Sequence, residues 1–158
     1  LDFSPSRSLY RQLKSKREIF YDSTDISADF LSDYHFDITK LDISDEMYDL
    51  VICYHVLEHV SEDSKAIKEL YRVTRTGGHC IIQTPFKEGE IYENPSMNTD
   101  ALRLKHFGQK DHVRIYSVSE LCERLTSCGF QVSVRHFEEL PVNRHGFNNH
   151  EVIIICSK

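Results

Sequence analysis

Two apolar runs separated by an amphipathic segment constrain the fold most. Residues Leu50 to Cys53 form a continuous apolar run, which is typical of a strand buried on both faces of a sheet. Residues 61–75 follow with apolar side chains at helical spacing, and we expect Gly77 and Gly78 to end that helix before a second apolar run, "HCIIQTP". A strand, a helix and a strand in this order predict a parallel sheet whose helices pack on its faces.

The rest of the chain continues this alternation. "LDF" is typical of the tail of a strand, a helix is predicted over residues 4–16, and another over 117–128. "QVSVRHF" and "EVIIICSK" are predicted as a final pair of strands joined by a polar loop. We therefore predict one α/β domain over residues 1–158, mostly parallel with an antiparallel last strand and helices on both faces. Because the chain starts without Met, we expect this domain to be N-terminally incomplete, with a truncated first strand.

Residues 86–115 show neither a helical nor a strand period. This insertion is rich in polar and aromatic side chains, and loops of this length inside a compact domain are usually functional. We expect it to form a mobile cover over a substrate pocket.

Charge and composition exclude several classes of protein. The net charge of −6 and the absence of a Lys/Arg run argue against a nucleic-acid partner. No apolar stretch approaches the roughly 20 residues needed to span a bilayer. The five cysteines lack a C-x-x-C pair, which predicts reduced thiols and a cytoplasmic location. The oligomeric state has no signature in the sequence.

Two acidic residues lie at the ends of short predicted strands, Asp25 in "REIFYDSTDIS" and Asp37 in "DYHFDIT". In parallel sheets, ligands bind beyond the carboxyl ends of the strands. Asp25 could accept hydrogen bonds from both ribose hydroxyls of a nucleoside, and we expect its side chain to be exposed in an empty cleft; alternatively it only caps a turn. Asp37 could accept the exocyclic amine of adenine, with Ile38 packed on the ring.

The stretch "YHVLEHV" contains His55-x-x-Glu58-His59, the spelling of an inverted zinc-protease motif. A protease site would need a further acidic ligand on another helix. Here the motif lies between a buried strand and a helix, so we predict no metal site. We expect Tyr54 and His55 at the mouth of a cofactor cleft, and Glu58 capping a local turn.

Three longer segments resemble one family: "MYDLVICYHVLEHV", "KAIKELYRVTRTGGHCIIQTP" and "HVRIYSVSELCERLTSCGF". They are similar to class I S-adenosylmethionine-dependent methyltransferases of the small-molecule branch called type 11, over about residues 1–136. The resemblance implies a Rossmann-like sheet and methyl transfer to an unidentified, small-molecule acceptor. It implies S-adenosylmethionine as the cofactor, with contacts from Ser4, Asp25, Ile26, Asp37, Ile38, Tyr54 and His55.

The first loop departs from that family. Phe3-Ser4-Pro5-Ser6 stands where the family has a glycine-rich loop. This resembles a variant subgroup with an "hFAPE"-like loop and a later "FGQ.DHVR.Y" segment, as in "HFGQKDHVRIY" here. Two alternatives remain open: a non-catalytic methyltransferase-like binding module, and another nucleotide-dependent enzyme such as a dehydrogenase.

A second polar patch contains His106, Asp111, His112 and Arg114. The first hypothesis is that His112 and Arg114 order the insertion or, together with His55, contact the acceptor. The second is that His112 is a catalytic general base, since an imidazole pKa near 6.5 suits proton removal. The third, ranked last, is a divalent metal site.

Overall fold

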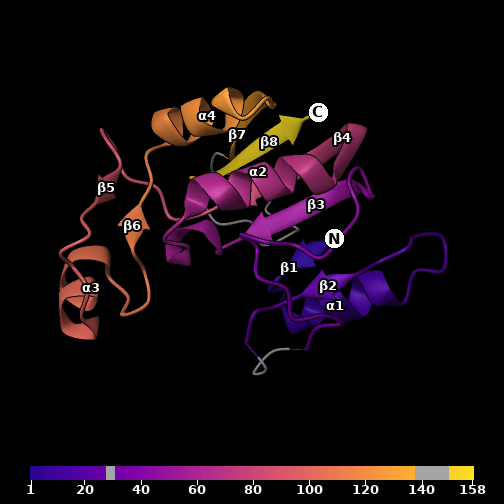
Figure 1. Cartoon of the computed structure of the whole chain (residues 1–158), viewed down its shortest axis with the longest axis horizontal. Coiled ribbons are helices and arrows are strands. Elements are labelled where there is room, and N and C mark those ends of the chain that lie inside the picture. The colour runs from indigo at the N-terminus through magenta and orange to yellow at the C-terminus, as the bar shows by residue number, and fades with distance from the viewer. Residues whose placement is uncertain (28–30, 138–149) are drawn as a thin grey trace.

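A six-stranded sheet forms the centre of the molecule (Figure 1). The computed structural model describes residues 1–27, 31–137 and 150–158; the polar loop expected before the last strand lies outside these ranges. The strand order is β2-β1-β3-β4-β8-β7. β1, β2, β3 and β4 pair in parallel, and β8 is antiparallel to both β4 and β7, which confirms the predicted fold class. The strands are Asp2–Phe3 (β1), Ser23–Thr24 (β2), Tyr48–Tyr54 (β3), Thr74–Gln83 (β4), Gln131–Phe137 (β7) and Glu151–Ser157 (β8).

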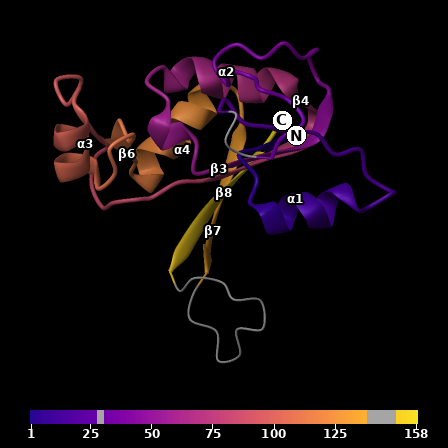
Figure 2. The ribbon, with the colours of Figure 1, turned by 90° about the horizontal axis from the view of Figure 1, so that it is seen from below.

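Helices lie on both faces of the sheet. α1 (Arg7–Lys14) lies on one side, and α2 (Asp63–Val73) and α4 (Val118–Ser127) lie on the other (Figure 2). The apolar positions of α2 explain its docking, because side chains three and four residues apart share one helical face. Its fully or almost fully buried apolar residues are Ala66, Ile67, Leu70 and Val73. None of the helices in the described part of the chain is long and apolar enough to cross a membrane.

The apolar run in β3 is buried on one face only. Val51 and Cys53 are fully buried, as predicted, whereas Leu50 is 43% exposed and Ile52 is partly exposed. The face that carries Val51 and Cys53 packs against α2 and α4 (Figure 2). On the other face Leu50 and Ile52 line a groove of about 430 Å³. The expectation that this strand is buried on both faces was therefore wrong, because Leu50 and Ile52 line a groove instead of packing against a helix layer.

The two glycines do not end α2. The helix ends at Val73, and Gly77 and Gly78 lie inside β4. A methyl group at Gly78 would come within 2.8 Å of the Asp49 carbonyl oxygen. Glycine is therefore needed where β4 passes β3, close to the irregular register between Tyr48 and Leu50.

The insertion has regular structure, contrary to the prediction from its sequence. It contains β5 (Tyr92–Glu93), α3 (Asp100–Phe107) and β6 (Arg114–Ile115), and β5 and β6 pair as an antiparallel ribbon. α3 has a Thr99 cap but buries only Phe107, so its sequence has no helical stripe of apolar residues. Together these elements form a lobe beside the sheet, at the left of Figure 1.

Candidate functional site

The order of the strands creates a crevice between β1 and β3. The chain passes from β1 to β2 on one side, and β3 then pairs with the other side of β1, which is the switch point where such sheets bind ligands. Ser4 and His55 follow the two strands, and both adopt left-handed backbone angles, with φ of 50° and 53°. Strained non-glycine residues of this kind gather at functional sites.

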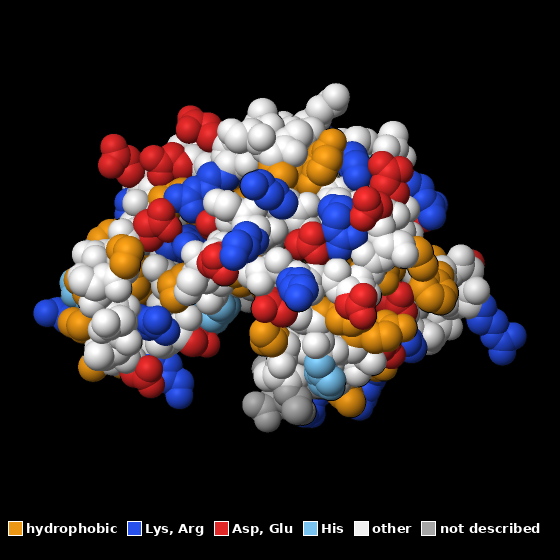
Figure 3. Space-filling model, viewed as in Figure 1, with side chains coloured by type: hydrophobic (Ala, Val, Ile, Leu, Met, Phe, Trp, Pro, Cys, Tyr) orange, Lys and Arg blue, Asp and Glu red, His pale blue; other side chains and the backbone are white. Residues whose placement is uncertain are grey.

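A pocket of about 750 Å³ opens beyond these strand ends. Figure 3 shows the molecule hollowed between the lobe that carries α3 and the part that carries α1 and β2, and residues from both sides line the pocket. The structure brings together six of the seven residues predicted to contact a cofactor. They are Ser4, Asp25, Ile26, Asp37, Ile38 and His55.

Asp25 lies in the pocket wall and is only 6% exposed. The expectation of an exposed side chain was wrong, because the carboxylate folds back onto its own loop. Its Oδ1 accepts hydrogen bonds from the Ser27 backbone N–H and the Ser27 hydroxyl, both at 2.7 Å. The carboxylate is thus held in place at the end of β2.

Asp37 repeats this arrangement farther along the connection between β2 and β3. The strand predicted before it was wrong, because within residues 31–47 only Tyr34 pairs, in an isolated bridge to Thr24. Oδ1 of Asp37 accepts from the Thr39 N–H at 2.8 Å and from the Thr39 hydroxyl at 2.7 Å. These hydrogen bonds lower the pKa of Asp37, so the group is a carboxylate at neutral pH. Between the two acids the pocket offers apolar surface from Ile26, which is 73% exposed, and Ile38.

Glu58 is the site residue whose role the sequence did not reveal. It lies in the short helical turn Leu57–His59 and is 1% exposed. Instead of capping that turn, its Oε1 lies 3.2 Å from Nδ1 of His55. Its Oε2 is buried and has no hydrogen-bond partner among the described residues. The HxxEH spelling was the available signal, but it gave no indication that the glutamate is buried.

His59 and Asp111 form another part of the pocket wall. Both line the pocket, and His59 Nδ1 lies 3.3 Å from Asp111 Oδ2. Behind them His112 packs edge-on against the His59 ring, with 4.6 Å between the ring centroids. His112 is 3% exposed, and burial lowers its pKa, so its imidazole is neutral at pH 7. It does not line the pocket.

Arg114 also lies behind the wall of the pocket. It is 5% exposed, and its guanidinium donates hydrogen bonds to the carbonyl groups of Leu57, Val60 and Ser61. It also forms an ion pair with Glu93 at 2.8 Å. Neither Arg114 nor Tyr54 lines the pocket.

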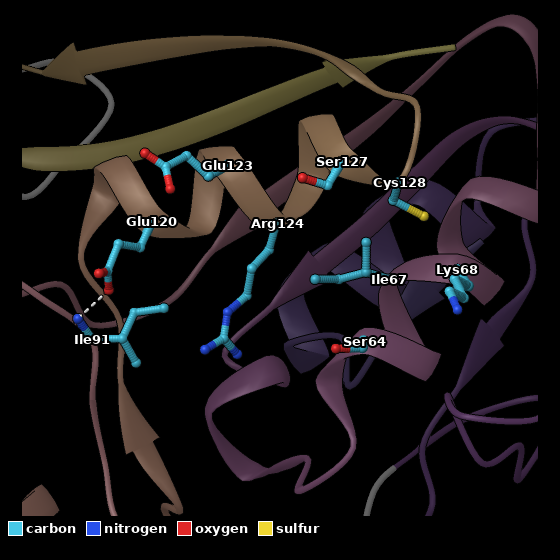
Figure 4. A pocket seen from close by; sticks show the side chains of 9 residues that line it. All are labelled: Ser64, Ile67, Lys68, Ile91, Glu120, Glu123, Arg124, Ser127 and Cys128. Carbon is cyan, nitrogen blue, oxygen red and sulfur yellow. Dashed lines mark hydrogen bonds between the residues drawn. The ribbon is translucent and has the colours of Figure 1, made fainter.

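A second cavity, of about 560 Å³, lies between α2 and α4 (Figure 4). Arg124 reaches into it from α4 and forms ion pairs with Asp63 and Glu93. Glu120 accepts a hydrogen bond from the backbone of Ile91. These contacts join the insertion to the helical layer. The cavity lies away from the strand ends, which makes the first pocket the candidate site.

Comparison with known proteins agrees with the fold. A family model described as "Methyltransferase domain" matches residues 2–82. Because the match covers half of the chain, the protein belongs to this family. The resemblance found in the sequence is thereby confirmed.

Curated relatives carry the same family name. The chain is 31% identical over 98 residues to a protein of Mycolicibacterium smegmatis named as a probable S-adenosylmethionine-dependent methyltransferase, covering 62% of this chain and 34% of the relative. It is 31% identical over 99 residues to a ubiquinone biosynthesis O-methyltransferase of Pseudomonas savastanoi, covering 60% and 43%. These matches span less than half the length of either relative.

Solved structures share the fold at low sequence identity. A methyltransferase from Archaeoglobus fulgidus matches with a TM-score of 0.69 and 16% identity, covering 99% of this chain and 84% of that one. An N1-methyltransferase from Burkholderia thailandensis, bound to 1,6-didemethyltoxoflavin and S-adenosylhomocysteine, matches with a TM-score of 0.65 and 15% identity, covering 99% and 69%. At such identities these matches establish the fold alone.

Replacing Ser4 with glycine tests the strain at the end of β1. Ser4→Gly should leave the free energy of unfolding unchanged or raise it by up to about 1 kcal/mol, because glycine adopts a positive φ without a Cβ clash. The matched control is Ser8→Gly, on the exposed surface of α1, which should lower it by roughly 0.5–1 kcal/mol. Urea unfolding measures both. Equal losses in the two variants would contradict strain at Ser4.

Replacing Arg114 with lysine tests its structural role. Arg114→Lys should lower the free energy of unfolding by about 2–4 kcal/mol, because an ammonium group cannot reproduce a buried guanidinium fork. Arg11→Lys, on the exposed surface of α1, is the control and should change it by less than about 0.5 kcal/mol. Denaturant unfolding followed by circular dichroism gives both values. If Arg114→Lys were as mild as the control, Arg114 would not be holding the turn.

Proposed function

We propose that this protein transfers a methyl group from S-adenosylmethionine to a small-molecule acceptor. The observation that supports this most is the pocket at the β1/β3 switch point of a methyltransferase-family sheet. It is lined by Asp25 at the end of β2 and by Asp37 in the loop between β2 and β3. A nucleoside needs such acceptors for its ribose hydroxyls and its amine, and it needs apolar surface for its base.

Each pocket residue has a distinct task in this proposal. Asp25 accepts the ribose hydroxyls, because its carboxylate is held by Ser27 at the end of β2. Asp37 accepts the amine of adenine, and Ile26 and Ile38 pack against the ring. Ser4 brings the backbone at the end of β1 close to the cofactor. Tyr54 is left out because its side chain does not line the pocket.

Methyl transfer requires the protein mainly to align the acceptor with the methyl donor. Bound S-adenosylmethionine would supply an electrophilic methyl group on a sulfonium. In-line displacement on that carbon requires the acceptor atom to lie close to the methyl group and in line with the bond that breaks. Holding the acceptor in this position can supply most of the rate. His55 lines the pocket with 61% of its side chain exposed, and we assign it to the acceptor side.

His112 and Arg114 support the acceptor side indirectly. The structure surrounds both with protein groups: His112 packs on His59, and Arg114 bonds to the turn at residues 57–61. We therefore assign to both the predicted role of ordering the insertion. The base role of His112 is not adopted, because a base must reach the acceptor.

The acceptor is proposed to be small. The relatives named above include an O-methyltransferase of ubiquinone biosynthesis and an N1-methyltransferase with its small substrate bound. The net charge of −6 supports an acceptor other than nucleic acid. All five cysteines are free thiols, which supports a cytoplasmic location.

One observation favours a second function, a non-catalytic binding module. Ser4-Pro5-Ser6 replaces the glycine-rich loop, and side chains at this turn limit how closely a cofactor can approach. Such a module would bind S-adenosylmethionine weakly or not at all. Calorimetry therefore separates the two functions, and NADH in the same titration tests the dehydrogenase alternative.

The first prediction from this proposal concerns Asp25. Wild-type protein should bind S-adenosylmethionine and not NADH. Asp25→Asn should weaken binding by about 1–3 kcal/mol through the loss of charge-assisted hydrogen bonds. Asp49→Asn is the matched control, since Asp49 is exposed near the opposite end of β3. Isothermal titration calorimetry gives the dissociation constants. An unchanged constant in Asp25→Asn would remove Asp25 from the site.

The second prediction concerns the insertion at residues 86–115, which we propose as the pocket cover. Gln109 and Asp111 are its members that line the pocket, while Arg114 anchors its end to the turn. S-adenosylhomocysteine should therefore slow hydrogen exchange at residues 108–112 more than within α4, the internal control. Exchange followed by mass spectrometry tests this. Equal slowing in both segments, or none at 108–112, would contradict a cover.

A further inference from the structure

Three side chains with metal-binding atoms meet beside the pocket. Glu58, His59 and His112 each offer one ligand atom, and these three atoms lie within 4.8 Å of one another. Glu58 and His59 come from the turn after β3, and His112 comes from the segment before β6. Two separate parts of the chain thus converge on one point.

The buried carboxylate of Glu58 is the second, independent observation. Glu58 is 99% buried, since its exposed fraction is 1%, and Oε2 has no hydrogen-bond partner among the described residues. A buried polar atom without a partner costs free energy, and each such atom calls for an explanation, an unseen ion among them. Oε1 of the same carboxylate already contacts His55, so Oε2 is the atom left for a ligand.

The surroundings of the cluster also suit an ion. His59 has the Asp111 carboxylate 3.3 Å from its Nδ1, and histidine ligands commonly have such a carboxylate partner that fixes the ring. Among the described residues no Lys or Arg forms an ion pair with Glu58 or Asp111; their partners are His55 and His59. An added cation would therefore meet two carboxylates and no competing cationic side chain within ion-pair distance of them.

We propose that Glu58, His59 and His112 bind one divalent transition-metal ion, with Zn²⁺ as the best match. Two imidazole nitrogens and one carboxylate oxygen form a ligand set typical of zinc sites that keep a fourth position open. Mg²⁺ prefers oxygen ligands and should not compete. Because His59 also lines the pocket, the ion lies at the pocket wall, where the open position is available to water or to an oxygen of the acceptor.

This ligand set differs from the one that the spelling HxxEH suggests. In a protease-like site both histidines of the motif, His55 and His59, would bind the ion. The set proposed here omits His55, uses the glutamate as a ligand and takes its third ligand from the insertion. The proposal therefore departs from the prediction of no metal site at this motif and keeps only the rejection of a His55–His59 pair.

Zinc titration of the whole chain tests the site without cofactor or acceptor, so the result does not depend on the proposed methyl transfer. Protein stripped with a chelator is titrated with Zn²⁺ by calorimetry, and Co²⁺ absorption reports the ligand geometry. We expect one Zn²⁺ per chain and no effect of excess Mg²⁺. Variants His59→Gln and His112→Gln remove ligands, His55→Gln tests the protease-like pair, and His79→Gln, exposed on β4, is the control. Circular dichroism confirms that each variant is folded.

Loss of one of three ligands should weaken Zn²⁺ binding by at least about 100-fold, since even loss of a supporting residue around such ligands costs 10- to 100-fold. His59→Gln should show this loss, and His112→Gln should match it. His79→Gln should bind like the wild type. His55→Gln removes a partner of the Glu58 carboxylate but no ligand, so it should weaken binding by about 10-fold and clearly less than His59→Gln. Wild-type binding no tighter than that of His59→Gln would overturn the proposal. So would a loss in His55→Gln equal to that in His59→Gln.

Discussion

The guanidinium of Arg114 holds together the turn after β3 and the insertion, the two segments that supply His59 and Asp111 to the pocket. It bonds to three carbonyl groups of residues 57–61 and pairs with Glu93. The first group belongs to the turn after β3, and Glu93 belongs to the insertion. Buried carbonyls need donors, and a planar fork with five N–H groups can serve several at once. One side chain therefore fixes the insertion against the sheet and places His59 beside Asp111.

The left-handed residues at the ends of β1 and β3 show how this chain can manage without a glycine-rich loop. Ser4 and His55 hold φ values of 50° and 53°, and each keeps a backbone hydrogen bond to a neighbouring strand, to Thr24 and Gln83 respectively. The sheet therefore imposes the sharp turns that glycine would otherwise make easy. The crevice keeps its backbone course, with Ser4 in its lining, and its strain is balanced by the sheet pairing around it.

The sheet and most of the pocket could be predicted because their signals are local. Apolar runs and helical spacing define the strands and helices, and topology then places Asp25 and Asp37 at one edge. Burial set by distant partners could not be predicted. For Arg114 the sequence left ordering of the insertion and contact with the acceptor both open, because its carbonyl partners are more than 50 residues away in sequence. α3 was missed because it buries only Phe107, so no apolar stripe marks it.

The HxxEH letters show how context decides what a motif means. On one face of a long helix, its two histidines would point the same way. Here the first histidine has a left-handed backbone at a strand end, and only Leu57–His59 forms a helical turn. That break turns the His55 ring toward the pocket, buries Glu58 and leaves His59 next to His112. The same five residues can then serve an acceptor pocket on one side and an ion on the other, with the Glu58 carboxylate between them.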